Sequence, residues 1–119
     1  MKPFVTNFNS VEDIVNSYGG NAEVDLKDAT IHLAWYGYGS YDGQSFVLYE
    51  KDGKLFEVNG KLFEVNGGHC SCHGLEGQWE PEETSLAALG MRNLNDSSYT
   101  EGSTEAHELL QAFIAGRAN

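Results

Sequence analysis

The chain has 119 residues, 40% of them hydrophobic, and its 18 acidic and seven basic residues give a net charge of −11. This length suits one domain with its own core, so we expect a single α+β domain over residues 1–119. Such a charge repels nucleic acid and anionic lipid and favours basic partners. The chain lacks both an apolar run of the roughly 20 residues that a membrane helix needs and an apolar secretory signal. These features predict a cytoplasmic protein.

The first predicted element is a short helix from Ser10 to Tyr18. Ser10 is a suitable N-cap, and Asp13 lies three residues further on, close to the capping-box spacing. The apolar positions of this segment follow the spacing of one helical face: Val11, Ile14, Val15 and Tyr18. We expect the helix to end at Gly19-Gly20-Asn21.

The middle of the chain is rich in β-branched and aromatic residues, which favour strands. Strands are expected at Thr30–Tyr38, Gln44–Lys51, Lys54–Val58 and Lys61–Val65. Turns are expected between and after them, at Gly39–Gly43, Asp52-Gly53, Asn59-Gly60 and Asn66–Gly68. Asp-Gly and Asn-Gly between apolar runs are the strongest two-residue hairpin signals. Together these patterns predict an antiparallel meander.

The heptapeptide KLFEVNG occurs twice in tandem, at 54–60 and again at 61–67. If Asn59-Gly60 is a two-residue turn, Phe56 faces Phe63 across a hairpin, which is a favourable cross-strand pair. Three outcomes are open: an added hairpin strand, one copy looped out at the edge, or exchange of a copy between two chains. Exchange would give a homodimer. The Asn-Gly turn favours the first two outcomes because it needs no partner chain.

Two further helices are predicted in the C-terminal part. Pro81 suits the first turn of a helix ending near Asn93, and the nearby Glu80, Glu82 and Glu83 favour its N-terminus. After a loop at 95–98, a helix is expected from Thr104 to Ala115, capped by Ser103 or Thr104 and ended by Gly116. Its apolar face is Ala106, Leu109, Leu110, Phe113 and Ile114. The predicted fold is therefore α+β: an antiparallel meander of about four or five strands with two or three short helices.

One loop collects possible metal ligands: His69, Cys70, Cys72 and His73. Zinc binds thiolates and neutral imidazoles in a tetrahedron, and a turn at Ser71 could gather three of the four side chains. A second separated ligand pair is missing, and only His32 and His107 could complete the set. Two alternatives remain open: a Gly-flanked loop that packs its cysteines in the core, or a reactive thiol activated by a neighbouring histidine.

A second candidate site is the acidic stretch from Glu76 to Glu83. The sequence has no Lys or Arg between Lys61 and Arg92, so this stretch has no local positive charge. Its candidate partner-binding residues are Glu76, Trp79, Glu80, Glu82 and Glu83, since an aromatic side chain among carboxylates is a reasonable interface anchor. The alternative is a solvated acidic face that only keeps the protein soluble.

The run from Val47 to Thr84, VLYEKDGKLFEVNG followed by GGHCSCHGLEGQWEPEET, resembles a segment of small uncharacterised bacteriophage and prophage proteins. In that family one GKLxEVNG passage leads directly into GxHCSCxGLExQWEPEET. The resemblance covers about a third of the chain and implies no established activity. The chain departs from the family in carrying the passage twice. It also departs at His73, where relatives are more often aromatic, so His73 is the weakest candidate ligand.

No P-loop, dinucleotide-binding or Ser-triad motif is present, and no pair of carboxylates suggests acid–base catalysis. The resemblance to phage proteins implies that this small acidic protein acts by binding a host protein, as such proteins often do. The leading hypothesis is thus a non-catalytic inhibitor that binds a basic surface of a host defence or nucleic-acid-handling complex. It would contact neither nucleic acid nor membrane directly. The alternatives are a small zinc protein using His69, Cys70 and Cys72, and a thiol-dependent enzyme.

Overall fold

The computed structural model describes residues 2–39, 42–51, 60–70, 74–95 and 100–118. The strands are β1 (Phe4–Thr6), β2 (Thr30–Tyr38), β3 (Gly43–Lys51), β4 (Lys61–His69) and β5 (Glu82–Thr84). The helices are α1 (Val11–Tyr18), α2 (Ala22–Leu26), α3 (Leu86–Leu89) and α4 (Ser103–Ala118). The strands form one sheet in the order β1-β2-β3-β4-β5, with β1 parallel to β2 and the other pairs antiparallel. The predicted α+β class is confirmed.

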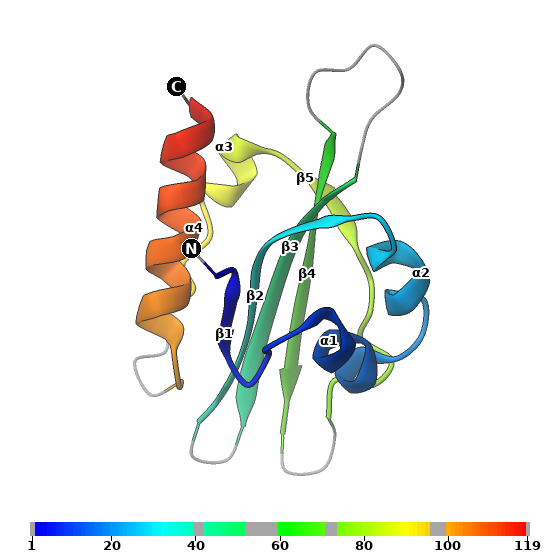
Figure 1. Cartoon of the computed structure of the whole chain (residues 1–119). Coiled ribbons are helices and arrows are strands. Elements are labelled where there is room, and N and C mark those ends of the chain that lie inside the picture. The colour runs from blue at the N-terminus through cyan, green and yellow to red at the C-terminus, as the bar shows by residue number, and fades with distance from the viewer. Residues whose placement is uncertain (1, 40–41, 52–59, 71–73, 96–99, 119) are drawn as a thin grey trace.

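Helices cover both faces of this sheet (Figure 1). On one face α1 and α2 contribute Ile14, Tyr18, Ala22 and Leu26 to a buried cluster with Ala34, Tyr36, Val47, Tyr49 and Val65. On the other face α3 and α4 bury Leu89, Ala106 and Leu110 against Val5, Leu33, Trp35, Phe46 and Leu48. Because side chains alternate between the faces of a strand, β2 and β3 supply both clusters and their central residues are buried. None of the described helices is long and apolar enough to span a membrane.

The first half of the chain largely follows the predictions. Helix α1 begins after Ser10, whose side chain accepts a hydrogen bond from the Asp13 amide at 3.3 Å, as expected for an N-cap. Its Tyr18 is fully buried and donates a hydrogen bond to Ser45 at 2.7 Å. Burial raises the pKa of Tyr18 to about 12, so this phenol stays protonated. The predictions for β2 and β3 are also confirmed, whereas β1 and α2 carried too short a pattern to be predicted.

The predicted helix starting at Pro81 is wrong. Residues Glu82–Thr84 form β5 beside β4, and the Thr84 hydroxyl donates to Glu64 at 2.6 Å. The helix starts only at Leu86, where Ser85 caps it by accepting a hydrogen bond from the Ala88 amide at 3.1 Å.

In the last helix, α4, Gly116 does not end the element as predicted, and the helix continues to Ala118. The predicted cap at Ser103 or Thr104 is also wrong, because both are already helical residues, and their side chains bond Asn95.

The predicted turn at Asn66–Gly68 is also wrong, because β4 continues through it to His69. Gly67 pairs with Ser45, and a Cβ there would lie 2.6 Å from the Tyr18 hydroxyl. Gly68 is held by Gln78, whose amide oxygen accepts from the Gly68 amide at 2.9 Å and whose amide nitrogen donates to the Gly68 carbonyl at 2.6 Å. These glycines therefore serve close packing within a strand rather than a turn.

The second copy of KLFEVNG forms the first seven residues of β4, directly beside β3. Phe63 pairs with Tyr49 of β3 on one side and with Glu83 of β5 on the other. Since both sides of β4 are occupied there, the predicted Phe56–Phe63 pair and the added hairpin strand are wrong. The first copy at 54–59 lies outside the described residues, and exchange between chains stays a prediction.

We expect the chain to fold after deletion of one copy, and to gain about 1 kcal/mol in its free energy of unfolding. Lys51 pairs with Lys61, so deletion of residues 54–60 would leave Asp52-Gly53 as a two-residue hairpin connection. Asp-Gly suits a type I′ turn, and shortening the connection lowers the entropy cost of loop closure by about 1 kcal/mol. Removing 61–67 instead would give the identical chain. Urea unfolding followed by circular dichroism measures the change.

A matched control replaces residues 54–60 by seven alternating Gly and Ser residues, which keeps the connection length and removes the copy. This variant should match the stability of the parent chain within about 0.5 kcal/mol. If the deletion unfolds the protein, or if the Gly-Ser control is clearly less stable, the first copy supports the fold and this account of the insertion is wrong.

Candidate functional site

The first candidate site lies at the end of β4, where His69 is the last strand residue and Cys70 follows it. Tyr36 and His69 share a hydrogen bond of 2.7 Å between the phenol oxygen and Nδ1. His69 pairs with Gly43 in β3, and a Cβ on Gly43 would lie 2.2 Å from the His69 ring. A glycine is therefore needed at position 43 so that the imidazole can pack across the sheet. The side chain of His69 is fixed by a strand rather than by a loop.

The rings of Tyr36 and Tyr38 pack edge to face with this imidazole and with each other. The centroids of Tyr36 and Tyr38 are 5.1 Å apart, and His69 lies 5.4 Å from Tyr36 and 5.3 Å from Tyr38. Burial, with a smaller contribution from Tyr38, raises the pKa of Tyr36. The phenol is consequently protonated at neutral pH and can donate to Nδ1. When Tyr36 donates to Nδ1, the proton of the imidazole lies on Nε2, which is directed away from Tyr36 and can donate a hydrogen bond to a ligand.

The structure describes only part of the predicted metal loop. His69 and the exposed Cys70 are described, whereas Cys72 and His73 lie outside the described residues. Within the described ranges no three His, Cys, Asp or Glu side chains are grouped so that they could hold a metal ion. His32 bonds Glu50, and Nδ1 of His107 accepts a hydrogen bond from the Leu94 amide. The zinc site and the reactive thiol both stay predictions.

The second candidate site, the acidic stretch, needs one correction. Trp79 is only 9% exposed and packs in the core, with its ring stacked on Tyr49 at 6.0 Å and edge-on to Tyr18 at 5.2 Å. Its indole nitrogen donates to Asp25 at 2.8 Å. The hypothesis that Trp79 is an exposed interface anchor is therefore wrong. The residue type alone favours this burial, because a large aromatic side chain is more often buried than exposed.

The carboxylates around Trp79 are exposed: Glu76, Glu80, Glu82 and Glu83. Two contacts hold their backbone in place. Gln78 bonds the backbone of Gly68 and also donates to the Gly74 carbonyl at 2.8 Å, and β5 pairs with β4. Glu83 lies 3.8 Å from Lys61, an exposed pair that contributes little stability. The exposed carboxylates are thus carried by a backbone that the sheet and Trp79 fix in position, with Glu82 and Glu83 on opposite faces of β5.

Cations near this surface are already engaged by carboxylates. Arg92 bonds Glu64 through Nε at 2.8 Å and through a terminal nitrogen at 3.3 Å. Glu64 is 1% exposed and also accepts hydrogen bonds from Thr84 and Asn66. Burial alone would raise its pKa, but these hydrogen bonds and the guanidinium charge hold the pKa of Glu64 below its usual range. Arg92 is therefore engaged mainly by Glu64, and its charge also interacts more weakly with that of Glu82.

A similar cluster lies at the end of the sheet opposite His69. Glu50 accepts hydrogen bonds from Arg117, from His32 at 2.7 Å and from the Gly60 amide at 2.8 Å. Burial opposes ionisation, but these bonds and the Arg117 charge lower the pKa of Glu50. No local sequence pattern indicates either cluster, because each joins residues far apart in the chain whose pairing depends on the strand register.

Comparisons with protein-family models, with curated proteins and with solved structures found no match to this chain.

Proposed function

We propose that the protein is a non-catalytic binding protein whose exposed carboxylates between Glu76 and Glu83 contact a basic surface of a partner protein. The observation that carries this proposal is that Glu76, Glu80, Glu82 and Glu83 are all exposed, while the basic residues nearest to them in the sequence offset them only in part. Lys61 pairs with Glu83, and Arg92 bonds the buried Glu64. The surface therefore keeps a net negative charge on a fixed backbone. A fixed charge pattern favours a complementary partner and speeds its association.

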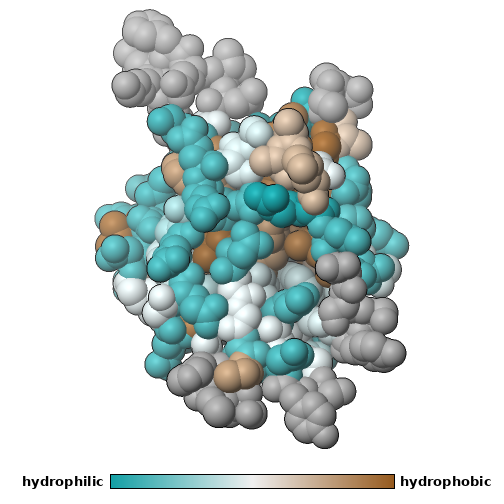
Figure 2. Space-filling view, turned by 180° about the vertical axis from the view of Figure 1, so that it is seen from behind, coloured by the Kyte–Doolittle hydropathy of each residue, from teal (hydrophilic) through white to brown (hydrophobic). Residues whose placement is uncertain are grey.

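The preferred partner is a host protein with a basic groove, of the kind that handles nucleic acid. Carboxylates on and beside an edge strand would compete with the phosphates that such a groove binds, and the protein would then act as an inhibitor. Hydrophilic residues dominate the face shown in Figure 2, with hydrophobic residues visible only in small areas between them.

Charge reversal tests the proposal. In Glu80→Lys/Glu82→Lys, two exposed carboxylates become cations while the Lys61–Glu83 pair is kept. A matched control, Glu12→Lys/Glu23→Lys, changes the net charge equally at exposed positions of α1 and α2. The wild type and both variants are each immobilised and incubated with bacterial host lysate. Mass spectrometry then quantifies the proteins that each one retains. We expect a basic partner that the wild type and the control both retain and that the site variant loses.

The site variant must first be shown to fold, by circular dichroism and thermal unfolding. If both variants lose the same proteins equally, binding depends on net charge alone and the proposed surface is wrong. If neither loses any protein retained by the wild type, carboxylates at these positions do not contact a partner.

A further inference from the structure

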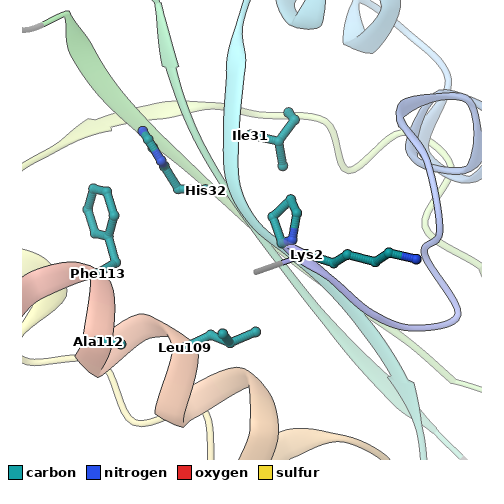
Figure 3. Close-up of a pocket in the computed structure, with 7 residues that line it drawn as sticks. Lys2, Ile31, His32, Leu109, Ala112 and Phe113 are labelled. Carbon is teal, nitrogen blue, oxygen red and sulfur yellow. The ribbon is translucent and has the colours of Figure 1, made fainter. Parts of the chain in front are cut away.

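A groove runs between β1 and α4, on the side of the sheet away from β5. It consists of two adjoining hollows of about 250 and 550 Å³ that share Lys2, Leu109 and Ala112 as lining residues. The remaining lining residues are Phe4, Glu105 and Glu108 in the larger hollow and Pro3, Ile31, His32 and Phe113 in the smaller one. Figure 3 shows the smaller hollow, with His32 and Phe113 facing each other at one end. The volumes are sufficient for several side chains of a bound peptide.

The outer edge of β1 borders this groove. Pro3 accepts a hydrogen bond from the Ala34 amide and Asn7 donates to the Tyr36 carbonyl, so the odd-numbered residues of this segment bond β2. In a parallel ladder the intervening residue then directs its amide and carbonyl to the opposite side. The backbone of Phe4 consequently faces away from β2, while its side chain packs on the α1–α2 face. Such an edge is a template for an additional strand.

The walls of the groove combine an apolar floor with an acidic rim. Leu109 and Ala112 lie on α4 together with Glu105 and Glu108, both of which are exposed. A lysine or arginine side chain matches this combination, because its aliphatic stem covers apolar surface while its charged end reaches a carboxylate. Lys2 is the only Lys or Arg among the described lining residues, and it is exposed, so two carboxylates face one cation along the groove.

The far end of the groove is built around His32. Strand β2 bulges there, since Ile31 pairs with Tyr49 and Leu33 with Leu48, which leaves His32 as the extra residue. Its ring lies 4.5 Å from that of Phe113, and its Nε2 lies 2.7 Å from Glu50. Bulges often direct a side chain towards a site. This end offers a partly apolar wall, and the carboxylate behind it is already paired with Arg117, whose guanidinium lies 5.2 Å from the centre of the Phe113 ring.

We propose that this groove binds an extended segment of a partner protein with lysine or arginine at alternate positions, which adds as a strand to the outer edge of β1. Residues on one side of that segment face α4, with their stems on Leu109 and Ala112 and their charges near Glu105 and Glu108. The proposal goes beyond the acidic stretch between Glu76 and Glu83, because β1 and β5 are opposite edges of the sheet. The two surfaces therefore fail or succeed independently.

A synthetic seven-residue peptide of alternating lysine and valine tests the site. It is titrated into the full chain and followed by amide NMR shifts and calorimetry. We expect saturable binding with shifts at Phe4 and along residues 105–112. Glu105→Gln/Glu108→Gln should weaken binding by about two- to tenfold, the range for two exposed ion pairs. Glu12→Gln/Glu23→Gln, with the same change in charge, should leave the affinity within about twofold.

Backbone methylation separates strand addition from simple charge attraction. In an added strand only alternate amides face β1, so methylating one alternate set of peptide nitrogens should abolish binding while methylating the other set should not. Equal binding of both methylated peptides, or equal binding of a peptide with glutamate in place of lysine, would overturn the proposal. Sedimentation of the chain as a dimer that the peptide does not dissociate would also overturn it, because a second copy would then occupy the edge.

Discussion

We expect Arg92→Met to lower the free energy of unfolding by about 3–5 kcal/mol at neutral pH, the usual cost of leaving a buried carboxylate without its cation. Glu64 is 1% exposed, so water cannot replace the two hydrogen bonds that Arg92 donates. Methionine keeps much of the apolar volume, and the loss is therefore mainly electrostatic. Urea unfolding of both proteins, followed by circular dichroism, measures the difference.

The pH dependence identifies the cause of this loss. The pKa of Glu64 is lowered by its partners, so its ionisation stabilises the parent chain above the usual carboxyl range, and this contribution is lost as pH falls through the lowered pKa. Without Arg92, burial should raise the pKa of Glu64 instead. The difference between the two proteins should therefore shrink towards about pH 4, and Glu64→Gln added to Arg92→Met should recover part of the stability. If the two proteins differ in free energy of unfolding by the same amount at neutral pH and at about pH 4, the role of Glu64 is contradicted.

The second large effect is expected for Trp79→Ala, which should cost about 3–5 kcal/mol, as for other buried tryptophans. The substitution removes a ring that packs against Tyr18 and Tyr49 and leaves a cavity under the acidic stretch. Thermal or urea unfolding gives the stability.

Trp79→Phe is the matched control for this prediction. It keeps an aromatic ring in the core but removes the indole hydrogen bond to Asp25 and part of the ring volume, so it should cost about 1–2 kcal/mol. Any Trp79→Ala protein that remains folded should still bind through its carboxylates. A stable Trp79→Ala protein that has lost only its partner would instead make Trp79 an interface residue, contrary to its burial.

Local patterns predicted the elements whose signals lie within one segment. The Ser10 cap with its apolar spacing predicted α1, and the β-branched and aromatic run from Thr30 to Tyr38 predicted β2. The same local reasoning failed at Pro81, because pairing of Thr84 with Leu62 in β4 outweighed the helix-start signal. The nearby Ser85, which does cap a helix, was the better signal.

The candidate site was less accessible to sequence reasoning. Asn66–Gly68 has the composition of a turn, and only contacts with Tyr18 and Gln78 make it part of a strand. That difference converts His69 from a loop residue into one fixed beside Tyr36. The acidic stretch can be recognised in the sequence from its composition, whereas the burial of Trp79 depends on tertiary packing against α2 and β3.

The most direct test of the central claim, that the exposed carboxylates between Glu76 and Glu83 bind a basic partner, is the affinity of the captured partner for three forms of the protein. Calorimetry would compare the parent chain with Glu80→Lys/Glu82→Lys and with Glu12→Lys/Glu23→Lys at two salt concentrations. We expect the first variant to bind roughly tenfold or more weakly, the second to stay within about twofold, and binding by the parent chain to weaken with salt. Equal affinities for all three forms would contradict the claim.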